Sequence, residues 1–145
     1  MVYGAEDEIY FTSRRPGSTG GEIDHRGDYF EDIYYSQFKY GFWQQPEQLP
    51  DNINTSTHDA CVGVSSDGEI LYLFRTSEDL VTGDLYSTEK FGTGWTEPKL
   101  LPGEVNSDAI ETSASISPDE HTIYFSSNRE GGYGGMDLYR VKRLP

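Results

Sequence analysis

The part of the sequence that most resembles a binding motif is SSNREGGYGGMDLYRV, residues 126–141. A glycine-rich loop can cradle a phosphate when a helix follows it, because the helix N-terminus supplies aligned N–H groups and the positive end of a dipole. The residues that follow here, Met136 to Val141, alternate in polarity and carry bulky side chains, which predicts a strand. We therefore expect a structural turn at Gly131, Gly132, Gly134 and Gly135 rather than a nucleotide site.

Other residue types that perform chemistry are present without the spacings that catalysis or metal binding needs. His25, His58 and His121 lie in different segments, and none has ligand spacing to a neighbour. Cys61 is the single cysteine, so an internal disulfide and a thiolate metal cage are excluded. Carboxylates are abundant, but abundance alone identifies no acid and base pair. The sequence predicts no catalytic residue, no enzymatic activity and no cofactor.

The charge of the chain narrows the range of partners. Its 145 residues suit one domain, and 11 Lys and Arg against 25 Asp and Glu give a net charge of −14. A strongly acidic surface repels phosphate backbones and anionic lipid, so nucleic acid is not an expected partner. The longest apolar run, Ile70 to Phe74, is too short to span a bilayer, and residues 1–10 show no signal-peptide pattern.

A repeat of 52 residues organises the chain. Trp43 and Trp95 are separated by this interval, and so are Asp67 and Asp119. The same interval relates further pairs, and the tripeptide Asp-Ile-Tyr or Asp-Leu-Tyr begins at Asp32, Asp84 and Asp137. Repeats of 20 to 50 residues indicate solenoids or propellers. We place the units at about residues 1–55, 56–107 and 108–145 of a single domain.

Each unit contains four short predicted strands in a fixed order. In the second unit these are ACVGVS, EILYLFR, GDLYSTEK and WTEPKLL, the first two joined by a turn at Ser66-Asp67-Gly68. The first strand is rich in small residues, and the second is apolar throughout, which suits a strand covered on both faces. The fourth contains Pro98, which cannot donate to a sheet and belongs at an outer edge. This gradient predicts an all-β fold of about three four-stranded antiparallel propeller blades.

These segments carry a resemblance to a known family. The runs ISPDEHTIYFSSNREGGYGGMDLYRV and GTGWTEPKLLPGEVNSDAIE resemble the TolB-type, WD-like β-propeller repeats of Gram-negative envelope proteins. The third unit matches nearly throughout, whereas the second loses the glycine-rich run. The resemblance assigns thirteen positions to the structural blade motif: Asp32, Tyr34, Trp43, Asn54, Asp67, Asp84, Tyr86, Trp95, Asn106, Asp119, Arg129, Asp137 and Tyr139.

The resemblance implies a fold more firmly than a function, because propellers host many functions. It implies a non-catalytic binding or scaffold module in the periplasm or at the outer membrane, with envelope proteins or glycans as partners. The alternative is a glycan-processing, sialidase-like enzyme or a peptidase-associated propeller. No Gly-x-Ser-x-Gly pentapeptide is present, and Ser65-Ser66-Asp67-Gly68 fits the sialidase box poorly because its glycine comes one place early.

One connection is the candidate site for recognition. RRPGSTGGEIDHRGDYFE, between the second and third strands of the first unit, is about ten residues longer than its counterparts, and such extra length commonly carries specificity. A tolerated, solvated insertion is the alternative. We expect this loop on the same face as the linkers between units, and we expect that deleting residues 17–28 would abolish binding without unfolding the protein. The predicted binding residues are Asp24, His25, Arg26, Asp28, Tyr29, His58, Asp59 and Glu111.

The linkers and the ends of the chain give three further expectations. Asn54 and Asn106 are expected to have a structural role, holding neighbouring blades by hydrogen bonds to turn N–H groups. A calcium ion is a possible ligand of crowded carboxylates, at Asp24, Asp28, Asp59, Asp108 and Glu111. We expect ten strands, beginning with a second strand near Glu8 to Ser13, although residues 1–5 could add a thin inner strand. The open blades should be completed by the rest of a longer propeller or by a second copy.

Overall fold

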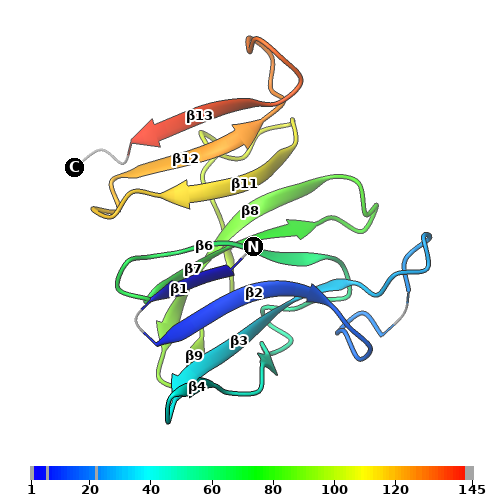
Figure 1. The fold of residues 1–145 in the computed structure, drawn as a ribbon. Helices are drawn as coiled ribbons and strands as arrows, with labels where there is room; N and C mark the ends of the chain where they lie inside the picture. Colours follow the sequence, from blue (N-terminus) through cyan, green and yellow to red (C-terminus); the bar gives the residue numbers. More distant parts are fainter. Residues whose placement is uncertain (1, 6, 22, 143–145) are drawn as a thin grey trace.

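The chain, described here from a computed structural model that covers residues 2–5, 7–21 and 23–142, is built from β-strands. Figure 1 shows three antiparallel sheets stacked one above another in the order of the sequence. The predicted all-β architecture of propeller blades is confirmed. Among the described residues, no helix is long and apolar enough to cross a membrane.

The sheets follow the three predicted units. The first sheet has the order β1 (Val2–Ala5), β2 (Glu8–Arg14), β3 (Glu31–Lys39), β4 (Phe42–Trp43), and β5 (Glu47–Gln48) also pairs with β3. The second has the order β10 (Lys99–Leu100), β8 (Gly83–Phe91), β7 (Ile70–Thr76), β6 (Asp59–Val64), and β9 (Gly94–Trp95) also pairs with β8. The third consists of β11 (Glu111–Ile116), β12 (Thr122–Ser127) and β13 (Asp137–Lys142).

The strand count differs from the expected ten in two ways, of which the first, an inner strand from residues 1–5, was allowed by the prediction. The described chain opens on the inner strand β1, which pairs with β2 from Val2 opposite Phe11 to Ala5 opposite Glu8. Each expected fourth strand is two separate two-residue strands, β4 with β5 and β9 with β10. The break falls next to Pro46 and Pro98, because proline has no N–H to continue the pairing. The part of the chain that the structure describes therefore has 13 strands rather than ten.

The middle strand of the second sheet is covered on both faces, as its apolar sequence predicts. Successive strand residues point to opposite faces, so Leu71 and Leu73 pack toward the first sheet while Tyr72 packs toward the third. Each face belongs to its own apolar cluster, with Tyr10 and Ile33 in one and Leu85 and Phe125 in the other. The two clusters hold the three sheets together by removing apolar surface from water.

Other motif residues form repeated local structures. Asp67 and Asp119 each accept a hydrogen bond from a serine two residues earlier and from the N–H two residues later, which closes the turn between first and second strands. The motif tyrosines each carry an arginine over the ring, in the pairs Tyr34 with Arg15, Tyr86 with Arg75 and Tyr139 with Arg129. The repeat thus reproduces side-chain contacts as well as strands.

Each linker is bound to the sheet that precedes it by a buried asparagine. Asn54 accepts the Ile33 N–H at 2.7 Å and donates to the Ile33 and Leu49 carbonyls at 3.0 and 2.9 Å. Asn106 makes the same three bonds with Leu85 and Leu101. The two asparagines bind backbone groups of a strand and of a strand end, rather than the turn N–H groups that the sequence predicts. The rim strands are too short to pair with the third strand at these positions.

The same linkers are bound to the following sheet by a buried ion pair. Asp59, at the start of β6, accepts from Arg75 Nε at 2.7 Å, and Arg75 also donates to the Ile53 carbonyl of the linker at 2.8 Å. One unit later Glu111 lies 3.0 Å from Arg129, which donates to the Glu104 and Val105 carbonyls. Together with the asparagines, these pairs fix neighbouring sheets to one another.

Candidate functional site

The long loop, residues 15–30, is packed onto the first linker. It connects β2 to β3 at the right-hand side of Figure 1, at the end of the sheet where β6 begins. The Phe30 ring lies 4.9 Å from the His58 ring, and the Glu31 N–H donates to His58 Nδ1 at 3.2 Å. A Cβ at Gly20 would lie 2.6 Å from the Phe30 ring and 3.0 Å from the Ser56 carbonyl of the linker, so glycine suits the close packing there. The loop therefore shares a face with the first linker, as expected.

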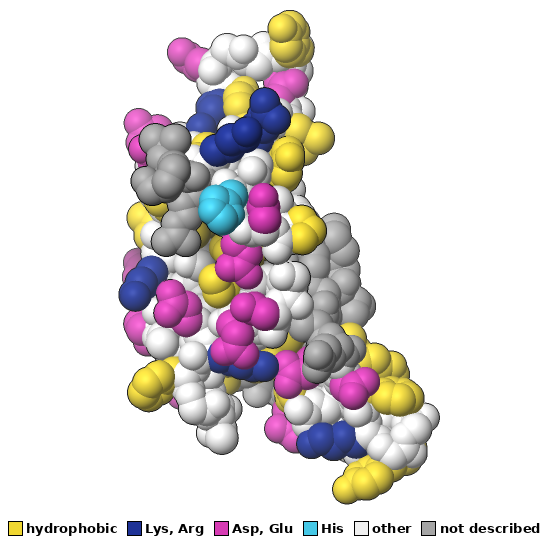
Figure 2. Space-filling view, turned by 90° about the vertical axis from the view of Figure 1, so that its left-hand side faces the viewer, with side chains coloured by type: hydrophobic (Ala, Val, Ile, Leu, Met, Phe, Trp, Pro, Cys, Tyr) yellow, Lys and Arg dark blue, Asp and Glu magenta, His cyan; other side chains and the backbone are white. Residues whose placement is uncertain are grey.

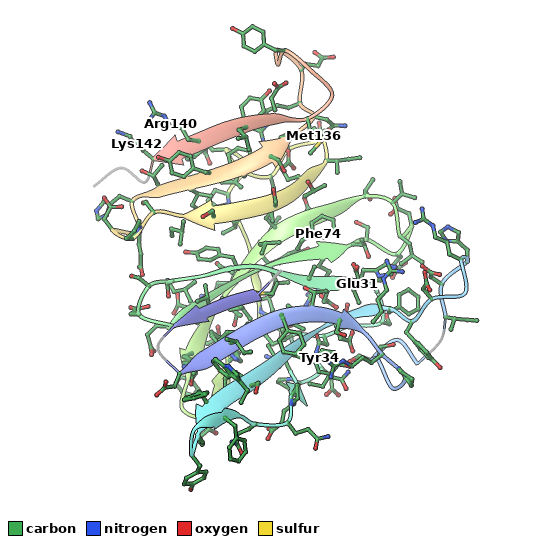
Figure 3. The ribbon with its side chains drawn as sticks, viewed as in Figure 1. Glu31, Tyr34, Phe74, Met136, Arg140 and Lys142 are labelled. Carbon is green, nitrogen blue, oxygen red and sulfur yellow. The ribbon has the colours of Figure 1, made fainter. Side chains whose placement is uncertain are left out.

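One arginine on this face contacts three carboxylates. Arg14, the last residue of β2, lies 3.5 Å from Asp24, 3.3 Å from Asp28 and 3.3 Å from Glu31. Glu31 begins β3, and Figure 3 shows it beside the loop. The guanidinium therefore joins both strand ends to the tip of the loop. A group of three carboxylates around one arginine stays negative overall and favours a cationic or hydrogen-bond-donating partner.

The tip of the loop is a preformed turn organised by Asp24. Its buried carboxylate accepts the N–H groups of Arg26 at 2.8 Å and Asp28 at 3.0 Å. These backbone bonds, the Asp28 N–H first, lower the pKa of Asp24 below its ordinary value. Gly27 takes a φ of 87°, which favours glycine. The turn consequently exposes four side chains to solvent, those of His25, Arg26, Asp28 and Tyr29.

The linker residues predicted to share this binding surface do not present their side chains to a partner. Asp59 and Glu111 are 0% exposed and each is paired with arginine, so their role in the structure is to hold neighbouring sheets. His58 is buried against Phe30 and accepts the Glu31 N–H, which makes it part of the support of the loop. The carboxylate of Asp24 is likewise internal. These four assignments are corrected from partner contact to support.

The predicted calcium ligands are not brought together. Asp24 and Asp28 share Arg14, Asp59 and Glu111 are occupied by Arg75 and Arg129, and Asp108 is exposed. Within residues 2–5, 7–21 and 23–142, no group of three or more His, Cys, Asp or Glu side chains could hold a metal ion. The expected crowding of the five acids is therefore wrong, since four of them are engaged by arginines in separate places.

The glycine-rich loop at residues 131–135 encloses one of the protein's own carboxylates. It connects β12 to the strand β13, as predicted, and no helix follows it. Asp137 accepts the N–H groups of Tyr133 at 2.8 Å and Gly134 at 3.0 Å. A Cβ at Gly132 would overlap this carboxylate. The N–H groups that could have bound a phosphate are thus engaged by Asp137.

The opposite face contains a second polar cluster that the sequence did not reveal. Glu8 accepts hydrogen bonds from Lys90 at 2.8 Å, Tyr35 at 3.0 Å and Tyr10 at 3.1 Å. Burial would raise the pKa of Glu8, but these hydrogen bonds outweigh it and lower that pKa. The group lines a hollow of about 460 Å³ beside Trp95. Figure 2 shows many Asp and Glu side chains on this face, where Asp67 and Glu69 lie near Glu8 around an adjoining hollow.

Sequence reasoning also missed Arg14 and Glu31 at the long loop. The one sign of these two residues in the sequence is that they lie at the ends of strands that flank an acidic loop. Glu8 and Lys90 are 82 residues apart and carry no motif, so only the placement of Trp95 by the repeat could have pointed to that hollow.

Comparison with known proteins supports the fold alone. No protein-family model matches the chain, and no curated protein matches it significantly in sequence. Among solved structures, the chain is similar to TolB from Acinetobacter baumannii, with a TM-score of 0.64 and 13% sequence identity. The match covers 97% of this chain and 29% of the TolB chain, so the chain spans less than a third of that protein. The likeness indicates a TolB-like propeller fold.

Proposed function

We propose that the protein is a non-catalytic binding module of a bacterial envelope protein, which recognises a protein or glycan partner through the tip of the long loop. The proposal rests on the contrast between the base of the loop, which is held by contacts, and its tip, which is exposed. Arg14, Phe30 and His58 anchor the loop, while His25, Arg26 and Tyr29 face solvent. A preordered loop loses little conformational entropy on binding, which favours recognition.

The envelope location is part of the same proposal. It is supported by the sequence resemblance to Gram-negative propeller repeats and by the structural likeness to TolB. A periplasmic or outer-membrane partner with basic or hydrogen-bond-donating groups suits the negative charge around Arg14.

The test is recovery of partners from native envelope extract by the immobilised protein, followed by mass spectrometry. We expect the triple variant His25→Ala, Arg26→Ala, Tyr29→Ala to lose the specific partner that the unaltered chain recovers. Arg26 contacts Asp24 through its main-chain N–H, so the substitution leaves the turn bonded. Deleting residues 17–28 is a poorer test, because it removes Thr19, which bonds to the buried Asp32.

A matched control has the same residue types at exposed positions outside the loop. The triple variant Lys39→Ala, Tyr40→Ala, His121→Ala removes one histidine, one basic residue and one tyrosine. It should recover the partner as well as the unaltered chain does. Recovery by the loop variant at the unaltered level would refute the proposal, and so would equal loss in both variants.

A glycan-processing or peptidase-associated enzyme is the alternative, and no contact favours it. The loop carboxylates that could act as acid and base, Asp24 and Asp28, both form ion pairs with Arg14, which engages them in a structural contact. A screen of chromogenic glycosides and peptides tests this alternative. Turnover that is abolished by Asp28→Asn would overturn the non-catalytic assignment.

A further inference from the structure

Three hollows adjoin one another at the junction between the first and second sheets, at the end of β2 and β3 away from the long loop. Their volumes are about 460, 420 and 210 Å³, and Gln37 lines all three. Glu8 and Lys90 line the first and second, and Tyr35 and Glu47 line the first and third. Together the hollows form one polar groove, here called the junction groove. Its largest part has the size of a small-molecule site, roughly 300–1,000 Å³.

The repeat does not account for the polar side chains of this groove. All four glutamines of the sequence line it: Gln37, Gln44, Gln45 and Gln48. The positions 52 residues later hold no glutamine: Glu89, Thr96, Glu97 and Leu100. In the strand pairing, Glu8 and Tyr35 correspond to Ile70 and Ser87 of the second sheet. Because the second sheet forms without these polar groups, blade architecture does not require them, and ligand binding is a reason for their presence.

Two of the glutamines are held so that their amide oxygens remain available to a ligand. Gln44 donates through its amide nitrogen to the Lys39 and Phe42 carbonyls at 3.0 and 3.1 Å, and Gln37 donates to Glu8 at 3.4 Å. Among the described residues, no hydrogen bond ends at the amide oxygen of either glutamine. An amide fixed through its nitrogen directs its oxygen to the other side. These oxygens are therefore preordered acceptors for a ligand that carries several donors.

The charges in the junction groove favour a neutral ligand. Lys90 opposes a cation there, and the exposed Glu47 opposes an anion. The Glu8 carboxylate is already occupied, because it accepts hydrogen bonds from Lys90 at 2.8 Å and from Tyr35 at 3.0 Å. Trp95 and Tyr35 add aromatic surface to the largest hollow, and such surface suits an apolar ring face. Hydroxyl donors on an uncharged ring with an apolar face are the chemistry of a sugar.

We propose that the junction groove binds a neutral oligosaccharide, with one sugar ring against Trp95 in the largest hollow and further rings along Gln37 toward Gln45. The sugar hydroxyls donate to the glutamine amide oxygens and to Glu47, and the C–H face of the ring packs on the indole. This site is separate from the long loop, since residues 15–30 do not line the junction groove. Either site can therefore be present without the other.

The two tryptophans of the chain allow the site to be tested by fluorescence. Trp95 lines the junction groove, whereas Trp43 lines none of its three hollows. Trp43→Phe leaves Trp95 as the source of tryptophan emission, and Trp95→Phe leaves Trp43. Both proteins are titrated with neutral hexasaccharides of glucose, mannose, galactose or N-acetylglucosamine. We expect at least one of these to change the emission of the Trp43→Phe protein saturably and that of the Trp95→Phe protein not at all. No saturable change in the Trp43→Phe protein up to about 10 mM, or equal changes in both proteins, overturns the proposal.

One further substitution tests where the oligosaccharide lies. In the Trp43→Phe protein, Gln37→Ala should weaken its binding about threefold to tenfold, the effect of one lost hydrogen bond. The matched control is Glu89→Ala, at the corresponding position of β8 and outside the junction groove. It should leave the affinity unchanged. An affinity that Gln37→Ala does not lower, or that both substitutions lower equally, overturns the assignment to this groove.

Charged probes test the preference for a neutral ligand. Hexamers of glucosamine and of galacturonic acid, positive and negative respectively, should bind about tenfold or more weakly than the best neutral hexasaccharide, because Lys90 and Glu47 oppose them. Equal or tighter binding of either charged hexamer overturns the proposal. The loop variant His25→Ala, Arg26→Ala, Tyr29→Ala should bind the neutral hexasaccharide as the unaltered chain does, so failure of this proposal and failure of the loop proposal are distinguishable.

Discussion

Replacing Asn54 with alanine tests the view that the linkers hold the sheets through buried amides. The substitution removes hydrogen bonds to one N–H and two carbonyl groups at a site that is 0% exposed. A buried polar group left without a partner costs about 1–3 kcal/mol. The Ile33 carbonyl keeps its hydrogen bond from the Leu49 N–H, so two groups, the Ile33 N–H and the Leu49 carbonyl, lose the partner that Asn54 supplies. With partial relief from water entering the vacated space, the expected loss is about 2–5 kcal/mol. This is a large fraction of the 5–15 kcal/mol, roughly, that stabilises a typical domain.

The assay is equilibrium unfolding in urea, with the free energy of unfolding compared between variants. Asn106→Ala should lose a similar amount, because it makes the same three bonds. The control is Asn128→Ala, since Asn128 is exposed and accepts one hydrogen bond, from the Ile110 N–H at 2.7 Å. It should cost less than about 1 kcal/mol. A loss at Asn54 no larger than that at Asn128 would refute the reasoning.

Three further predictions concern other contacts. Burial alone would raise the pKa of Glu111, but hydrogen bonds from Ser127, Ser107 and Arg129 lower that pKa below 4.5. The stabilising effect of the Glu111 carboxylate is therefore present above about pH 4.5, and it is lost as the pH falls through the lowered pKa. Glu111→Gln should therefore reduce the free energy of unfolding most near pH 7, with a difference that shrinks below about pH 4.5; a difference independent of pH would contradict this. Gly132→Ala should destabilise the protein by roughly 1–3 kcal/mol in urea unfolding, because its Cβ would displace the Asp137 carboxylate, whereas Gly134→Ala, which meets nothing within 4 Å, should have a much smaller effect. Arg14→Ala leaves Asp24, Asp28 and Glu31 without their shared cation and should accelerate chymotrypsin cleavage at Tyr29, while Arg140→Ala should not; equal rates would show that Arg14 does not order the loop.

The repeat accounts for the parts of the fold that the sequence predicts. Trp43 and Trp95 mark the rim, and Asp67 and Asp119 mark the turns, because the same local geometry recurs wherever these residues do. Strand β1 is predicted only as an option, since its four residues, VYGA, contain no repeat landmark. The proline in each rim strand indicates that the strand is interrupted, but it does not indicate how long the interruption is.

The candidate site was predicted only in part because its contacts join segments that are distant in sequence. Extra length identified the loop, and the exposed His25, Arg26 and Tyr29 follow from it. The burial of Asp59 and Glu111 could not be inferred, because their arginine partners do not keep the repeat interval. Arg75 and Arg129 are 54 residues apart while the two acids are 52 apart, so each arginine reaches its acid from a different position.

The asparagine contacts of the linkers also allow transient opening of each junction between sheets to be measured. The amide protons of Ile33 and Leu85 are bonded to the side-chain oxygens of Asn54 and Asn106 and not to a neighbouring strand. Each proton can exchange with deuterated solvent only after its linker lifts from the sheet. Their exchange rates, set beside those of amides within β7, therefore give the free energy of opening one junction separately from that of unfolding a sheet. The exchange rates of these two backbone amides therefore show whether neighbouring blades separate one at a time or together.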